Sequence, residues 1–208
     1  ISVGRALSRA SKGALREAAK DLLRKRLLAY AARGTVPVVT NSQFVRDTLL
    51  THFGVSSRVL HPPIRNFGPG IEPKDPIILS VGRFFRGLYN EKRYEFLTKM
   101  FRDLSGTELR GWEYHIAGAA AGDNRTRSFL RQLERENTGC PVVFHVNADH
   151  ETLRQLYQRA SIFWHAAGFD CDEMAEPERA EHFGMTTVEA MSAGCIPVVV
   201  NKGGQREI

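Results

Sequence analysis

Residues 181–200 read EHFGMTTVEAMSAGCIPVVV, a helix, a stop signal and a strand in succession. The pattern predicts a helix over 186–193 that ends at Gly194, because glycine adopts the left-handed conformation found after helices at little steric cost. The apolar run 196–200 that follows is typical of a buried strand. A helix followed at once by a buried strand is the repeating unit of a parallel α/β sheet.

The same alternation extends upstream of this stretch as far as residue 77. Helical patterns separate the apolar runs and are long enough to cross back over a sheet, which favours parallel strands with right-handed connections. The sequence therefore predicts an α/β fold, a Rossmann-like parallel sheet flanked by helices. The expected strands are 77–81, 112–117, 141–146, 161–165 and 196–200, and the other expected helices are 92–104, 125–136 and 149–160.

A second domain is expected before this sheet. Residues 65–76 are rich in Gly and Pro, a composition typical of a linker. We therefore divide the chain into the end of an N-terminal domain (1–64), a linker (65–76) and a main domain (77–208). The N-terminal part should contain a helix over 13–33, a short strand over 36–40, and a helix from about residue 42 to 53. The chain lacks an initial Met and ends after a Gly-Gly turn, so we expect both domains to be incomplete.

Composition excludes several classes of protein. Hydrophobic residues make up 42% of the 208 residues and charged residues 25%, which is typical of a folded, globular chain and argues against disorder. Three widely spaced cysteines argue against a disulfide framework and fit a reducing compartment, so we expect a cytoplasmic protein. No apolar run approaches the roughly 20 residues of a membrane span, and no signal peptide is expected.

The net charge of +6 is concentrated in residues 1–33, which hold nine Lys or Arg and two acidic residues. The simplest interpretation is the solvated face of a helix. Alternatively, this segment attracts the protein to an anionic membrane surface as a peripheral protein. A nucleic-acid partner is not expected, because no aromatic platform or known reader motif accompanies the charge.

Two carboxylates flank the start of the predicted helix 186–193. Glu181 and Glu189 lie on either side of Gly184, and the backbone N–H groups of Gly184, Met185 and Thr186 should be free to face a ligand. An anion site beside two hydroxyl-binding carboxylates would suit a phosphorylated sugar. Alternatively, the acids only complement the helix dipole, which is common.

Two cations lie at the same expected edge of the sheet, where ligands of such folds bind. Arg83 follows the first strand, and Lys92 begins the next helix, where a cation opposes the helix dipole. A bound anion would remove this unfavourable interaction, so the pair is a candidate clamp for a diphosphate. The alternative for Lys92 is a solvated surface lysine.

Several segments, taken in order, carry a resemblance to a known family. They are SVGR (80–83) with Lys92, YHIAG (114–118), the Glu181/Glu189 motif, AMSAGCIPVV (190–199), GGQREI (203–208) and, nearer the N-terminus, TNSQF (40–44) and HPP (61–63). The segments between 80 and 208 resemble the nucleotide-sugar-binding domain of retaining glycosyltransferases of family 4, the glycosyl transferases group 1 domain of the GT-B fold. TNSQF and HPP resemble the segment that closes the N-terminal domain of that fold before the linker.

The resemblance implies metal-independent transfer of a hexose from a nucleotide-diphosphate sugar to a glycan or lipid-linked acceptor, with no cofactor. Glu181 would then bind hydroxyls of the donor sugar, Glu189 would bind the ribose, and Arg83 and Lys92 would neutralise the diphosphate. Glu181, Arg83 and Lys92 are the implied catalytic residues. The other implied donor-binding positions are Gly82, Gly118, Val146 (by its backbone, near the base), Phe183, Gly184, Met185 and Thr186.

Other interpretations stay open at this point. A different GT-B enzyme, such as a nucleotide-sugar epimerase or a phosphorylase, would carry similar motifs, and so would a non-catalytic nucleotide-sugar-binding or membrane-docking module. Residues 167–180 form a long acidic loop that we expect to be a solvated insertion, or else a lid or sugar selector. A zinc site of His165, Cys171 and His182 is not expected, because their spacing matches no known metal pattern.

Overall fold

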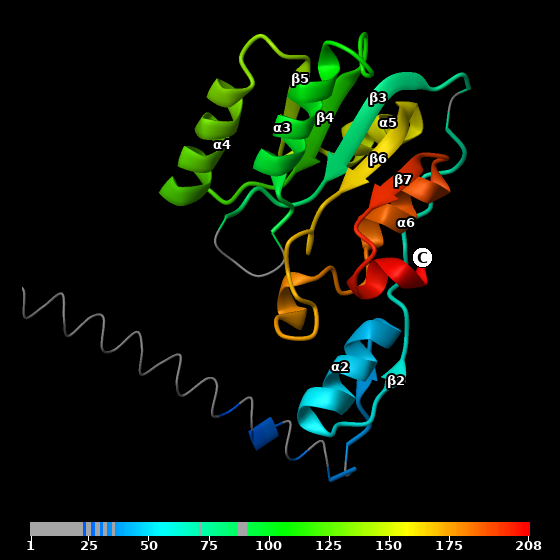
Figure 1. The fold of residues 1–208 in the computed structure, drawn as a ribbon. Helices are drawn as coiled ribbons and strands as arrows, with labels where there is room; N and C mark the ends of the chain where they lie inside the picture. The colour runs from blue at the N-terminus through cyan, green and yellow to red at the C-terminus, as the bar shows by residue number, and fades with distance from the viewer. Residues whose placement is uncertain are drawn as a thin grey trace, which may run out of the picture. The chain divides into compact units, whose positions relative to one another are not determined.

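The computed structural model describes residues 36–70, 72–86 and 91–208, together with isolated positions between 23 and 34 (Figure 1). The chain divides into two compact units, one that ends at Leu60 and one that begins at His61. Most of the helix predicted over 13–33, and with it the basic segment, lies outside the described residues. No described helix is both long enough and apolar enough to cross a membrane.

The first unit contains a helix between two short parallel strands. Strand β1 (Val39–Thr40) pairs with β2 (Arg58–Val59), and α2 (Gln43–Phe53) lies between them in sequence. The Oγ of Ser42 accepts a hydrogen bond from the Val45 N–H, and Gly54 follows the helix with a φ of 66°. The predicted helix start and stop are therefore confirmed by the local chemistry of capping. The strand predicted over 36–40 is shorter than expected.

The second unit is the predicted parallel α/β sheet. Its five strands lie in the order β5-β4-β3-β6-β7, and every neighbouring pair is parallel. Each predicted strand and helix is confirmed within two residues. The strands are β3 (Asp75–Val81), β4 (Glu113–Gly118), β5 (Val142–Val146), β6 (Ala160–His165) and β7 (Ile196–Val199); the helices are α3 (Tyr94–Ser105), α4 (Asn124–Glu136), α5 (His150–Arg159) and α6 (Met185–Ser192), with short 3₁₀ helices at Pro177–Arg179 and Gly203–Glu207.

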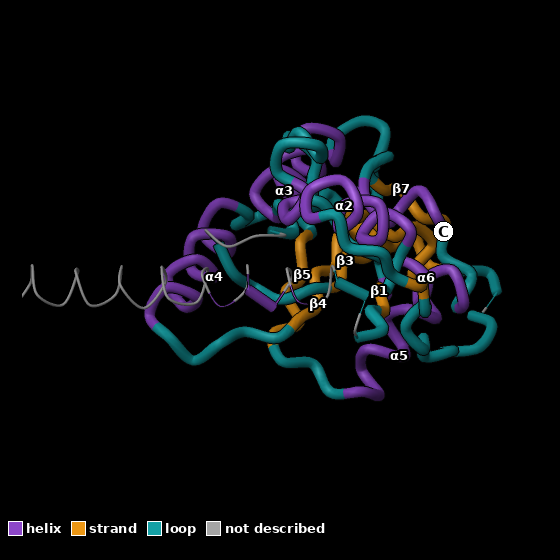
Figure 2. Tube along the Cα trace, turned by 90° about the horizontal axis from the view of Figure 1, so that it is seen from below, coloured by secondary structure: helices purple, strands orange, loops and turns teal. Residues whose placement is uncertain are grey.

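The core has two layers because side chains alternate along each strand. On β3, Ile78 packs with residues of α3 and α4, whereas Ile77, Leu79 and Val81 pack with residues of α5 and α6. Figure 2 shows α3 and α5 on opposite sides of the strands. Both faces of the sheet are thus buried, which leaves the carboxyl ends of the strands as the place for a ligand.

Two glycines bring the ends of β3 and β4 into close contact. The Gly82 N–H donates to the Ala117 carbonyl at 3.0 Å. A Cβ on Gly118 would lie 1.7 Å from the Gly82 oxygen, which is closer than any real contact. Only glycine therefore fits at position 118. Gly82, the residue before Arg83, lies directly against it where β3 ends.

The stretch with linker composition packs on the second unit. Phe67 is buried in the layer that contains α5 and α6. The Lys74 ammonium donates hydrogen bonds to the carbonyls of Tyr157, Gln158 and Ala193 at 3.4, 3.0 and 2.6 Å. A cation that satisfies the last carbonyls of two helices is a favourable arrangement, and it anchors this stretch to the ends of α5 and α6.

Candidate functional site

The site is built around Glu181, in the segment that enters α6. Its carboxylate Oε2 accepts a hydrogen bond from Lys92 Nζ at 2.6 Å and lies 3.1 Å from His165 Nε2. These side chains come from three segments: Lys92 precedes α3, His165 ends β6 and Glu181 precedes α6. Their exposed fractions are 12% for Glu181, 15% for Lys92 and 2% for His165, so the group is largely shielded from water.

This environment keeps Glu181 ionised. Burial alone would raise the pKa of its carboxyl group. The hydrogen bond from His165 and the positive charge of Lys92 outweigh burial and hold the pKa of Glu181 well below its ordinary value. Glu181 is therefore a fixed, negatively charged hydrogen-bond acceptor at neutral pH.

His165 is held by a second partner, Gln205. The Gln205 Nε2 lies 3.2 Å from His165 Nδ1. An amide that donates to Nδ1 leaves the ring proton on Nε2, where it points to Glu181; this tautomer is assigned from the hydrogen-bond pattern. Burial lowers the pKa of His165, the bond to Glu181 partly offsets this, and the charge of Lys92 lowers it further. The imidazole is thus a neutral donor.

Gly82 makes room for Lys92 at the edge of the sheet. A Cβ on Gly82 would lie 2.8 Å from Lys92 Cγ and 3.0 Å from the Tyr94 hydroxyl oxygen. That hydroxyl donates to the Gly82 carbonyl at 2.9 Å. The absence of a side chain at position 82 therefore lets the Lys92 stem pass to Glu181.

The start of α6 lies next to this group. Gly184 precedes the helix with a φ of 106°, and its Cα faces the Gln205 amide, which would lie 2.9 Å from a Cβ. The first N–H groups of a helix have no intrahelical partner. The helix start predicted at Gly184, Met185 and Thr186 is thus confirmed, and Gln205 contacts both Gly184 and His165.

Glu189 has different partners from Glu181. It lies in the second turn of α6, and its Oε2 accepts a hydrogen bond from the Tyr157 hydroxyl of α5 at 3.0 Å. Burial raises the pKa of Glu189, and the Tyr157 bond and the charge of Arg65 offset part of the effect. The two acidic residues of the motif therefore occupy two separate polar environments.

The predicted pair Arg83 and Lys92 is divided between two environments. Lys92 contacts Glu181 and His165, whereas the Arg83 guanidinium lies over the Phe85 ring at 5.0 Å. Arg83 also lines a depression of about 690 Å³ with Arg86, Arg125 and residues 119–121. Their joint action on one diphosphate stays a prediction.

The remaining predicted positions are spread along the same edge of the sheet. Val146 ends β5 and is 39% exposed, whereas Phe183 is buried, with its ring 5.2 Å from that of His61. Among the residues that the structure describes, no group of His, Cys, Asp or Glu could hold a metal ion, and this includes the set of His165, Cys171 and His182.

Two residues of the site were not predicted. His165 entered the sequence analysis only in a discounted zinc set, and Gln205 only within the motif 203–208. The available signal was position, since His165 is the last residue of a predicted strand and the carboxyl end of a strand is where such folds bind ligands.

Comparison with known proteins places the chain in a family. The family model described as glycosyl transferases group 1 matches residues 64–208. The chain is 27% identical over 183 residues to sulfoquinovosyl transferase SQD2 of Arabidopsis thaliana, covering 86% of the chain and 30% of that protein. It is 26% identical over 207 residues to mannosylfructose-phosphate synthase of Agrobacterium fabrum, covering 89% of the chain and 41% of that protein. The chain thus spans less than half the length of both relatives.

Solved structures share the fold. The crystal structure of TarM superposes with a TM-score of 0.63 at 13% identity, covering 88% of this chain and 33% of that one. The catalytic domain of starch synthase IV from Arabidopsis thaliana, bound to ADP and acarbose, gives a TM-score of 0.56 at 13% identity, covering 83% of this chain and 40% of that one. The expected Rossmann-like half of a GT-B fold is confirmed. Because the family model covers more than half of the chain, the chain belongs to the glycosyl transferases group 1 family.

Proposed function

We propose that this chain supplies the donor-binding half of a retaining hexosyltransferase that uses a nucleotide-diphosphate sugar. One observation supports the proposal beyond family membership: Glu181 is a nearly buried carboxylate kept ionised by Lys92 and His165. A fixed anion in a site of low dielectric accepts hydrogen bonds from hydroxyl groups strongly. In this proposal, Glu181 binds hydroxyls of the donor sugar.

The positive groups at this edge of the sheet suit the leaving group. Negative charge grows on the diphosphate as the glycosidic bond breaks, and fixed cations and backbone N–H groups lower the barrier to that step. We assign this role to Lys92, Arg83 and the N–H groups of Gly184, Met185 and Thr186. These groups would neutralise the negative charge of the diphosphate in place of a metal ion. The proposed reaction therefore requires neither a metal nor a cofactor.

Glu189 and Val146 complete the proposed donor site. The Tyr157 hydroxyl fixes the Glu189 carboxylate, which can accept hydrogen bonds from ribose hydroxyls. The backbone at Val146 would contact the base. The acceptor, a glycan or a lipid-linked sugar, would be bound by other parts of the protein in the cytoplasm, and contact of residues 1–33 with a membrane stays part of this proposal.

The proposal is tested by titrating UDP-glucose, GDP-mannose and ADP-glucose separately into the full-length protein by calorimetry, with a chelator present. We expect saturable binding of one donor, weakened at least tenfold in Glu189→Ala, because a hydrogen bond to a charged group contributes about 1.5–3 kcal/mol. Binding only after Mg²⁺ or Mn²⁺ is restored would contradict metal independence. Failure of all three donors to bind would contradict the proposal and favour a module that does not bind nucleotide sugars, such as a membrane-docking module.

Reaction products separate the proposed enzyme from other members of its fold class. A hexosyltransferase releases the nucleoside diphosphate only when an acceptor is present. Conversion of the donor to an isomer without an acceptor would instead identify an epimerase, and a requirement for inorganic phosphate would identify a phosphorylase.

A further inference from the structure

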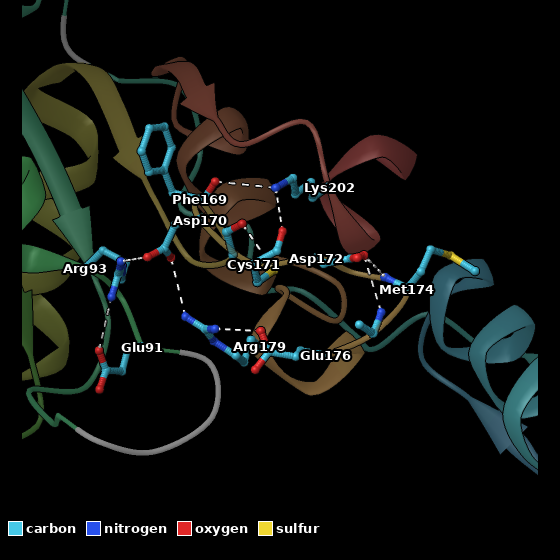
Figure 3. A network of polar contacts seen from close by, with 12 residues as sticks. Glu91, Arg93, Phe169, Asp170, Cys171, Asp172, Met174, Glu176, Arg179 and Lys202 are labelled. Atoms are coloured by element: carbon cyan, nitrogen blue, oxygen red, sulfur yellow. Dashed lines mark hydrogen bonds and ion pairs between the residues drawn. The ribbon is translucent and has the colours of Figure 1, made fainter.

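Residues 167–180 are tied to the segments on both sides of the Glu181 group. The expectation of a solvated insertion holds for Asp172 and Glu178, which are exposed. It is wrong for Glu173, whose side chain is only 19% exposed and is paired with Arg206. Asp170, at 46% exposed, pairs with Arg93 and with Arg179, the latter at 3.5 Å (Figure 3).

One set of contacts leads to Lys92. Asp170 accepts from the guanidinium of Arg93, the residue that immediately follows Lys92. Arg93 precedes α3 with a φ of 57°, a left-handed conformation that is uncommon for a residue with a side chain. Next to this pair the rings of Phe169 and Phe96 stack with centroids 4.3 Å apart. The insertion thus contacts the start of α3 through one ion pair and one aromatic stack. Both contacts are made by residues that closely follow Lys92 in the chain.

A second set of contacts leads to Gln205. The Glu173 carboxylate accepts from the Gly203 N–H at 2.7 Å and pairs with Arg206, so it holds the 3₁₀ helix Gly203–Glu207 at both ends. Lys202 donates to the carbonyl of Cys171 at 2.7 Å (Figure 3). Gln205, within this short helix, contacts His165.

The same 3₁₀ helix also rests directly on the backbone of Glu181. The Gly204 N–H donates to the Glu181 carbonyl at 2.8 Å. A Cβ on Gly203 would lie 2.3 Å from that oxygen, so the two segments are in the closest contact that glycine allows. A displacement of residues 203–207 would therefore move both Gln205 and Glu181.

We propose that residues 167–180 are a brace for the donor site and that Asp170 and Glu173 are positioning residues. Asp170 acts through Arg93 on Lys92, and Glu173 acts through Gly203 and Arg206 on Gln205. Lys92 and His165, which Gln205 orients, are the two groups that hold Glu181. This inference rests on the proposed function in one respect: it takes the nucleotide-sugar donor to be the ligand that Lys92 and Glu181 bind.

The brace is tested first without any ligand, by hydrogen exchange of the full-length protein. Glu173→Ala removes the acceptor of the Gly203 N–H and should raise exchange over residues 202–206 about tenfold. Asp170→Asn should do the same over residues 97–100, which begin at Leu97, whose N–H donates to the Arg93 carbonyl. Glu178→Gln is the matched control, because it removes one negative charge from an exposed position of the same loop, and it should leave both segments unchanged. Unchanged exchange in Asp170→Asn and Glu173→Ala would overturn the brace.

The second test is a double-mutant cycle on the affinity for UDP, GDP and ADP. For the nucleotide that binds, Asp170→Asn should lower the affinity about tenfold in the wild-type background. The same substitution should lower it less than twofold in a Lys92→Met background. Equal losses in both backgrounds would overturn a route through Lys92. If no nucleotide binds to the wild-type protein but exchange responds as expected, the proposed function fails and the brace stands. If a nucleotide binds to the wild-type protein but exchange does not respond to the substitutions, the brace fails and the proposed function stands.

Discussion

Glu181→Gln is expected to lower kcat/KM for glycosyl transfer by about 100- to 1000-fold, the range found when one fixed polar group is removed from a transition-state site. The amide has the size of the carboxylate but no charge, and it faces two donors, Lys92 Nζ at 2.6 Å and His165 Nε2 at 3.1 Å. The donor sugar would lose its ionised acceptor, and Lys92 its counterion. Initial rates at donor concentrations far below KM measure the effect.

The fold should survive this substitution. Lys92, only 15% exposed, would lose its ion-pair partner, which should lower the free energy of unfolding by about 3 kcal/mol. A domain of ordinary stability remains folded after such a loss. Glu178→Gln, the same change at an exposed position, should leave both the rate and the stability unaltered. Transfer at the wild-type rate in folded Glu181→Gln would contradict the role of Glu181.

Gly118→Ala is expected to lower the free energy of unfolding by about 3 kcal/mol, the upper part of the usual range for overpacking a well-packed site. The new Cβ would lie 1.7 Å from the Gly82 carbonyl oxygen, so backbone must move. That movement is resisted, because Gly118 itself pairs with Val146 of β5 and its carbonyl accepts from the Asn147 N–H at 2.8 Å. Urea unfolding of the wild-type and variant proteins gives the difference.

Gly122→Ala provides the matched control for this prediction. It is the same substitution four residues later, where a Cβ would meet nothing within 4 Å. It should change stability by less than about 1 kcal/mol, with a small gain if the unfolded chain loses freedom. Equal unfolding midpoints for the two variants would show that the strands tolerate a side chain at position 118.

The sheet was predictable because its signals are local. Gly194 ends α6, and Asp149 caps α5 through a hydrogen bond from the Thr152 N–H, three residues away. Apolar runs with the periods of strands and helices then fix the alternation. A parallel sheet follows from the crossover lengths alone. None of these inferences requires knowledge of contacts between distant residues.

The contacts within the site were not predictable for the opposite reason. Lys92 and Glu181 are 89 positions apart in sequence, and His165 and Gln205 are 40 apart. The pattern placed Lys92 and Glu181 at one edge of a sheet, but it could not show that Lys92 pairs with Glu181 while Arg83 lies over Phe85. Pairing of Asp170 and Glu173 with Arg93 and Arg206 likewise depends on how loops meet in space.

The central claim is that Glu181 binds the sugar of the donor and Glu189 binds the nucleoside. Calorimetry of the full-length protein tests it by comparing a nucleotide-diphosphate sugar with the matching nucleoside diphosphate in three proteins: wild type, Glu181→Gln and Glu189→Gln. The wild-type protein should bind the nucleotide-diphosphate sugar more tightly than the nucleoside diphosphate, and this difference is the sugar increment. Glu181→Gln should remove that increment, whereas Glu189→Gln should weaken both ligands by the same factor. A sugar increment retained in Glu181→Gln would contradict the account.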